Sequence, residues 1–87
     1  MTVIVELFGV ARQCAGVAKT EAQGARLGDV LVDLAGRFPR LAAECIDGSR
    51  LRHGYLANLN GARFIRDPAT VVAPGDSLLI LATDAGG

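Results

Sequence analysis

Two apolar stretches decide the fold of this chain, TVIVELF at residues 2–8 and SLLILA at residues 77–82. The first is dense in β-branched and aromatic residues, which predicts a strand with alternate side chains on opposite faces. The second is continuously apolar, as is typical of a strand at the centre of a sheet covered on one face. If the two lie together in the middle of one sheet, they are parallel neighbours joined by a crossover connection.

The segment between these strands contains the clearest helix. Apolar residues recur at steps of three and four from Leu27 to Leu41, which is typical of an amphipathic helix, and Pro39 should end it near Phe38. Asn60-Gly61 predicts a tight hairpin turn. The shorter elements expected are helical turns at 10–15 and 40–45, strands at 17–21, 55–59 and 62–65, and a loop at 46–50.

The order strand, strand, helix, strand, strand, strand indicates an α+β fold. With the first and last strands adjacent, it is the ubiquitin-like β-grasp, a mixed sheet packed on one main helix. We expect one domain over residues 1–82 and a flexible C-terminal Gly-Gly tail over residues 83–87, which is too small and polar to hold a core.

Composition excludes several classes of protein. The 87 residues are 51% hydrophobic and 21% charged, which fits one small globular domain and not a disordered chain. Nine basic and nine acidic side chains cancel, which argues against a nucleic-acid binder. No apolar run approaches the roughly 18 residues of a membrane span, and the N-terminus has no export signal, so we expect a cytoplasmic protein.

The chain offers few groups for catalysis or metal binding. Its cysteines, Cys14 and Cys45, and its one histidine, His53, are too few for a zinc site or an iron–sulfur cluster. We expect two buried thiols and an exposed loop histidine, although a Cys–His pair stays open. No Ser-His-Asp set, phosphate loop or supported carboxylate pair is present. We expect no metal, no bound cofactor and no catalysis by the chain alone.

The informative feature is the end of the sequence, Ala85-Gly86-Gly87. Glycine has no Cβ and adopts backbone angles that other residues avoid, so a Gly-Gly segment can enter a narrow channel of another enzyme. A carboxylate is a poor electrophile, and it would need activation as a mixed anhydride with AMP. The alternative is an inert glycine tail.

A family resemblance supports the hypothesis that the C-terminal carboxylate is activated. The run LFGVARQCAG at residues 7–16 resembles the first strand and turn of the ThiS/MoaD sulfur-carrier family. FPRL at 38–41, LNG at 59–61, PGD at 74–76 and the final Gly-Gly also match in order. The resemblance implies that Gly87 is adenylated by a ubiquitin-activating-type enzyme, which uses ATP. The product becomes a thiocarboxylate that donates sulfur to a biosynthetic acceptor.

Within that family the helical region and the Arg12 turn resemble the molybdopterin synthase small subunit most, which implies a role in molybdenum cofactor biosynthesis. That subunit usually has a Pro-Pro pair before its tail, whereas this chain has LATDA at residues 81–85. Carriers for thiamine, cysteine or tRNA thiolation therefore stay open, as does a protein modifier joined to lysines. A regulatory β-grasp module is a different class, but such modules sit in longer chains and need no Gly-Gly.

The expected partner surface lies on one face of the sheet. Phe8 shares a face with Ile4, and Phe64 and Leu81 are expected to join them, because an exposed apolar sheet patch usually marks an interface. By resemblance, Phe8, Arg63 and Leu81 match positions that dock onto the activating enzyme and the synthase large subunit. Core positions are the alternative for Phe8 and Leu81. Arg12 either anchors its turn or contacts a partner.

Overall fold

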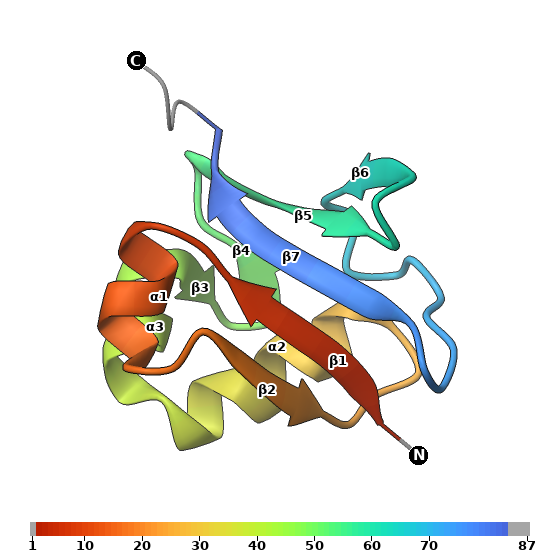
Figure 1. Ribbon diagram of the computed structural model, residues 1–87, viewed down its shortest axis with the longest axis horizontal. Helices are drawn as coiled ribbons and strands as arrows, with labels where there is room; N and C mark the ends of the chain where they lie inside the picture. The colour runs from red at the N-terminus through yellow and green to blue at the C-terminus, as the bar shows by residue number, and fades with distance from the viewer. Residues whose placement is uncertain (1, 84–87) are drawn as a thin grey trace.

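A mixed five-stranded sheet with helices on one face makes up the structure, a computed structural model that describes residues 2–83 (Figure 1). In that view the sheet lies in front of α2 and α3. The elements are β1 (Val3–Leu7), α1 (Val10–Ala15), β2 (Lys19–Ala22), α2 (Leu27–Arg37), α3 (Pro39–Cys45), β3 (Ile46–Asp47), β4 (Arg50–Leu51), β5 (Tyr55–Leu59), β6 (Arg63–Ile65) and β7 (Ser77–Ala82).

The two apolar strands are parallel neighbours, as predicted. The sheet order is β2-β1-β7-β5-β6, and β1 pairs with β7 in parallel from Ile4 opposite Ser77 to Leu7 opposite Ile80. The other pairs in this sheet are antiparallel. This topology, wrapped around α2, is the ubiquitin-like β-grasp.

The core lies between the sheet and the helices. Leu31 and Leu34 of α2 are fully buried, as the periodicity predicts, whereas Phe38 is only half-buried. Phe38 is less buried because it lies at the junction of α2 and α3, where the Arg37 guanidinium sits 5.2 Å from its ring centroid. Pro39 opens α3 at its first turn, where a missing N–H costs nothing.

The expected loop at residues 46–50 is wrong. Ile46–Asp47 and Arg50–Leu51 form a two-stranded antiparallel hairpin, β3 and β4, and Gly48 has a φ of 65° between them. The hairpin forms because Ile46 and Leu51 are both buried in the core, so the turn sequence between them is held by apolar residues at each end. None of the helices within residues 2–83 is long and apolar enough to cross a membrane.

The hairpin at Asn60-Gly61 confirms its prediction. The two residues have φ angles of 57° and 69°, the pair of positive values that a type I′ turn requires. The Asn60 side chain also fixes the start of β7, since its Oδ1 accepts from the Ser77 N–H at 2.8 Å and its Nδ2 donates to Asp76 at 3.1 Å. The turn and the central strand are therefore joined at this end of the sheet.

Candidate functional site

The exit of the central strand is where the predicted tail begins. β7 is hydrogen-bonded to β1 on one side and β5 on the other. Immediately after it, the Thr83 N–H donates to the Gly54 carbonyl at 2.8 Å, and the Thr83 hydroxyl donates to the same oxygen at 3.3 Å. The backbone is thus held in place up to Thr83. Gly86 and Gly87, predicted to carry the activity, lie outside the described residues.

An apolar patch covers the outer face of the sheet beside this exit. Register places Leu81 opposite Leu56, and Asn58 lies between Leu79 and Phe64. The Phe8 N–H donates to the Ile80 carbonyl at 3.1 Å, which extends the β1–β7 pairing to the end of β7. The outer patch comprises Phe8, Leu56, Phe64, Leu79 and Leu81.

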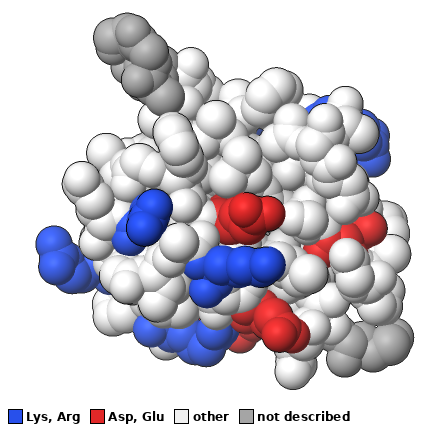
Figure 2. All heavy atoms as spheres, in the orientation of Figure 1, with Lys and Arg blue, Asp and Glu red and all other residues white. Residues whose placement is uncertain are grey.

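The two aromatic residues of the outer patch are exposed to solvent. Phe8 is 57% exposed and Phe64 is 63% exposed, so both are surface residues and the core alternative is wrong for Phe8. Leu81 is half-buried on the same face. Figure 2 looks onto this face: Lys, Arg, Asp and Glu are spread over its centre, its lower half and its right-hand side, while the surface around the upper end of β7 is largely uncharged. Such a surface fits a protein partner.

A small hollow lies beside the last residue of β7. Phe8, Gly9, Val10 and Ala82 line it, and its volume is about 150 Å³. Gly9 turns the chain from β1 into α1 with a φ of 62°, a left-handed conformation that favours glycine. This sharp turn brings the start of α1 beside the end of β7, and it leaves an apolar recess next to the strand exit.

The two candidate arginines are placed differently. Arg12 is exposed on α1 and lines a second hollow with Phe8 and Gly9, so it lies beside the outer patch. The one ion pair within residues 2–83 joins Arg37 to Asp33, so no carboxylate in this part of the chain ties down Arg12. Arg63 lies opposite Leu59, on the other face of β6 from Phe64. The structure therefore groups Phe8, Leu81 and Arg12 and sets Arg63 apart.

Sequence reasoning missed two members of the outer patch, Leu56 and Leu79. The alternation of β5 and β7 could have assigned each to a face of its own strand. Which residues they lie beside depends on how β5 pairs with β7, however, and no turn joins those strands directly.

The thiols do not form a reactive site. Both cysteines are free. Cys45 is fully buried, as expected, but the expectation is wrong for Cys14, which is only partly buried because α1 turns Ala11 and not Cys14 into the core. Burial above all, with Cys14 nearby, raises the pKa of the Cys45 thiol to about 11, so it stays protonated at neutral pH.

The other candidate polar groups do not form a reactive cluster within the described residues either. The Tyr55 hydroxyl donates to Glu44 at 2.7 Å, and this bond raises the pKa of Tyr55. His53 is exposed in the turn before β5. No three His, Cys, Asp or Glu side chains converge within the described residues.

The chain combines a ubiquitin-like fold, an apolar patch on the outer face of its sheet and a sequence that ends in Gly-Gly. The family model for the ThiS family matches residues 5–87, so the chain belongs to the ThiS family. Members are small sulfur carriers that act with partner enzymes.

Solved structures support the fold over the whole chain. A chain of the BexX/CysO complex of Amycolatopsis orientalis is 25% identical with a TM-score of 0.81, covering 98% of this chain and 99% of that one. SAMP1, a small archaeal modifier protein from Haloferax volcanii, is 23% identical with a TM-score of 0.81 and full coverage of both chains.

A third solved structure has the same fold. A Pyrococcus furiosus protein named as molybdopterin converting factor subunit 1 is 24% identical with a TM-score of 0.75, covering 94% of this chain and 97% of that one. The comparison with curated proteins gave no match.

Proposed function

We propose that this protein is a cytoplasmic sulfur carrier whose chemistry takes place at the carboxylate of Gly87. The observation that carries the proposal is the family match, which spans residues 5–87 and so includes the central strand and Gly87. In the first step a carboxylate oxygen of Gly87 attacks the α-phosphorus of ATP, and pyrophosphate leaves. In the second step hydrosulfide attacks the acyl carbon, AMP leaves, the added sulfur loses its proton, and a thiocarboxylate results.

The activating enzyme supplies the catalytic groups and the ATP in this proposal. The domain contributes position, since the β7 pairing and the Thr83–Gly54 hydrogen bonds fix the point from which the tail extends. Gly86 has no Cβ, so the chain at this residue can lie in a channel too narrow for a side chain. In this proposal the chain itself needs no bound cofactor.

The outer patch is the proposed docking surface for the activating enzyme and for the protein that receives the sulfur. Phe8 and Leu81 lie in it beside the tail exit, so a partner seated there has the tail within reach of its active site. Arg12 lies at the rim of the patch, where an acidic group of the partner would pair with it. Arg63 would contact only a partner that extends around the edge strand β6.

We propose a molybdopterin precursor as the sulfur acceptor, with this chain as the small subunit of the synthase. The helical region and the Arg12 turn support this choice, and the fold shared with the Pyrococcus protein is compatible with it. The likeness to the CysO complex, at 25% identity, favours a second candidate, a sulfur acceptor in another biosynthetic route such as cysteine formation. Intact-mass spectrometry distinguishes the two candidates. The thiocarboxylate form of this protein should lose its added sulfur when it is mixed with the true acceptor and its enzyme, and should keep it with the other acceptor.

Exchange of labelled pyrophosphate into ATP tests the activation step. With a ubiquitin-activating-type enzyme, exchange should require this protein, and deletion of Gly87 should abolish it. Phe8→Ala should raise the concentration needed for half-maximal exchange by about tenfold or more, as loss of a buried aromatic anchor does. The matched control is Val71→Ala, which truncates an apolar residue that is 68% exposed, somewhat more than Phe8, and lies outside the patch. Equal effects of the two substitutions would contradict the proposed surface.

A further inference from the structure

The strand β2 lies at an edge of the sheet and has free backbone groups. Among the described residues it pairs only with β1. The Leu7 N–H donates to the Ala18 carbonyl at 2.9 Å, which marks that pair as hydrogen-bonded. Because hydrogen-bonded and non-hydrogen-bonded pairs alternate, Lys19 and Glu21 direct their N–H and C=O groups away from β1. Such an edge is a template for another strand.

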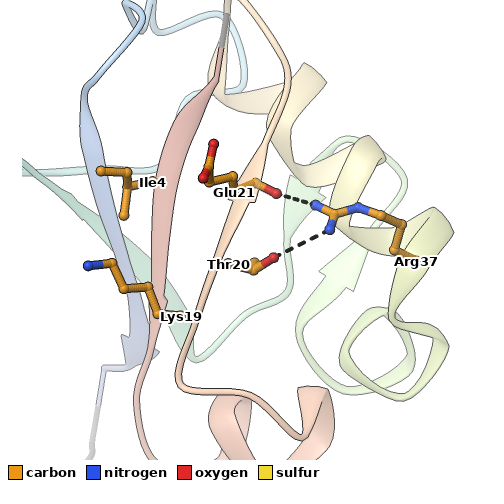
Figure 3. Close-up of a pocket in the computed structure, with 5 residues that line it drawn as sticks. All are labelled: Ile4, Lys19, Thr20, Glu21 and Arg37. Carbon is orange, nitrogen blue, oxygen red and sulfur yellow. Dashed lines mark hydrogen bonds between the residues drawn. The ribbon is translucent and has the colours of Figure 1, made fainter.

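One side chain covers part of this edge. Arg37, at the end of α2, donates from Nη2 to the Glu21 carbonyl at 2.5 Å and from Nη1 to the Thr20 hydroxyl at 3.4 Å (Figure 3). Asp33 holds the same guanidinium at 3.4 Å. Beside it lies an open hollow of about 670 Å³, lined by Ile4, Lys19, Thr20, Glu21 and Arg37. The edge is therefore accessible, and one of its acceptors is occupied from within the molecule.

The sequence of the edge complements itself. In an antiparallel pair of two β2 strands centred on Thr20, Lys19 of each copy lies opposite Glu21 of the other. These are the residues whose backbone groups point outward, so each of the two pairs can exchange two backbone hydrogen bonds. Each pair also sets a lysine across from a glutamate, and opposite charges across strands stabilise a sheet.

We propose that the edge of β2 is a self-association surface, at which a second copy of this chain pairs antiparallel about Thr20. The arrangement is two-fold symmetric and joins the two five-stranded sheets into one. Arg37 must leave the Glu21 carbonyl before the pair forms, so it limits the strength of association. This surface is separate from the outer patch around the end of β7, and the proposal does not rest on sulfur transfer.

Sedimentation equilibrium over a range of protein concentrations tests the pairing. The wild-type protein should show a concentration-dependent dimer, and Arg37→Ala should strengthen it by about tenfold, the value of one charge-assisted hydrogen bond. Arg40→Ala, which removes an exposed arginine from α3, should leave the dimer unchanged. An Arg37→Ala protein that dimerises no more strongly than the Arg40→Ala protein would overturn the proposed role of Arg37.

Charge exchange tests the register. Lys19→Glu and Glu21→Lys should each weaken the dimer, because like charges then face each other across the pair, and the double variant should restore it. Failure of the double variant to recover, with circular dichroism showing a folded protein, would overturn the register.

A cysteine cross-link gives a readout that does not depend on charge. Thr20 lies opposite itself in a non-hydrogen-bonded pair, where Cβ atoms are about 5 Å apart and near disulfide reach. Thr20→Cys should therefore form a disulfide-linked dimer on mild oxidation. Lys19→Cys places its two thiols diagonally, about 7–8 Å apart between Cβ atoms, and should cross-link far less. Equal yields from the two variants, or none from Thr20→Cys, would contradict antiparallel pairing about Thr20.

Discussion

Truncation of Leu34 tests the packing of α2 against the sheet. Leu34 is fully buried within the apolar cluster that α2 shares with β1 and β7, so Leu34→Ala removes apolar contacts and leaves a cavity. Substitutions of this kind cost about 2–5 kcal/mol. A domain of 87 residues has a total stability of about 4–13 kcal/mol. The change should therefore remove a large share of the stability and lower the melting temperature by at least about 10 °C.

Val32 provides the matched control for this experiment. It lies on the same helix, is β-branched and is 54% exposed, so Val32→Ala should change the free energy of unfolding by less than about 0.5 kcal/mol. Urea denaturation followed by circular dichroism measures both variants, and an unchanged slope with urea shows that the same surface unfolds. A loss for Leu34→Ala no larger than that for Val32→Ala would refute the placement of α2 over the core.

Four further substitutions test local features of the fold. Gly24→Ala should destabilise by more than about 1 kcal/mol in urea unfolding, because an added Cβ would lie 2.7 Å from the Cβ of Asp29. Gly36→Ala, at a helical position with nothing within 4 Å of the added Cβ, should instead stabilise by about 0.5–1 kcal/mol in the same assay. Gly61→Val should lower the melting temperature, since its φ of 69° is strained for a β-branched residue. A backbone N–H, and then the Asn60 amide, lowers the pKa of Asp76 in the folded protein. Its carboxylate therefore stabilises the fold above its ordinary pKa. That contribution is lost as pH falls through the lowered value, so Asp76→Asn should reduce the acid sensitivity of unfolding.

Local patterns predict the central features of the fold well. The alternation in residues 2–8 puts Val3 and Val5 on one face of the strand and Phe8 on the other, because a strand has a strict period of two. The structure shows that the face of Val3 and Val5 is the buried one. Asn60-Gly61 predicts its turn type, since few other residues take two successive positive φ angles. The β3–β4 hairpin was missed because its two-residue strands are too short for alternation to appear.

The candidate site is predictable only in part. Arg63 and Phe64 are adjacent in β6, so they cannot share a face, and alternation alone already separates Arg63 from the outer patch. Leu56 joins the patch through its pairing with Leu81, a contact between strands distant in sequence that local pattern does not encode. The open edge of β2 likewise depends on sheet order, and the Arg37 contact depends on where α2 ends.

Intact-mass spectrometry of the protein after incubation with ATP, a ubiquitin-activating-type enzyme and a sulfur source tests sulfur loading at Gly87 most directly. We predict a mass increase equal to the exchange of one oxygen for one sulfur, located at Gly87 by fragmentation. Deletion of Gly87 should abolish the increase, whereas Cys14→Ala and Cys45→Ala should retain it, because the sulfur is carried on the acyl carbon and not on a thiol. A cysteine variant that loses the added sulfur while the Gly87 deletion retains it would contradict the mechanism.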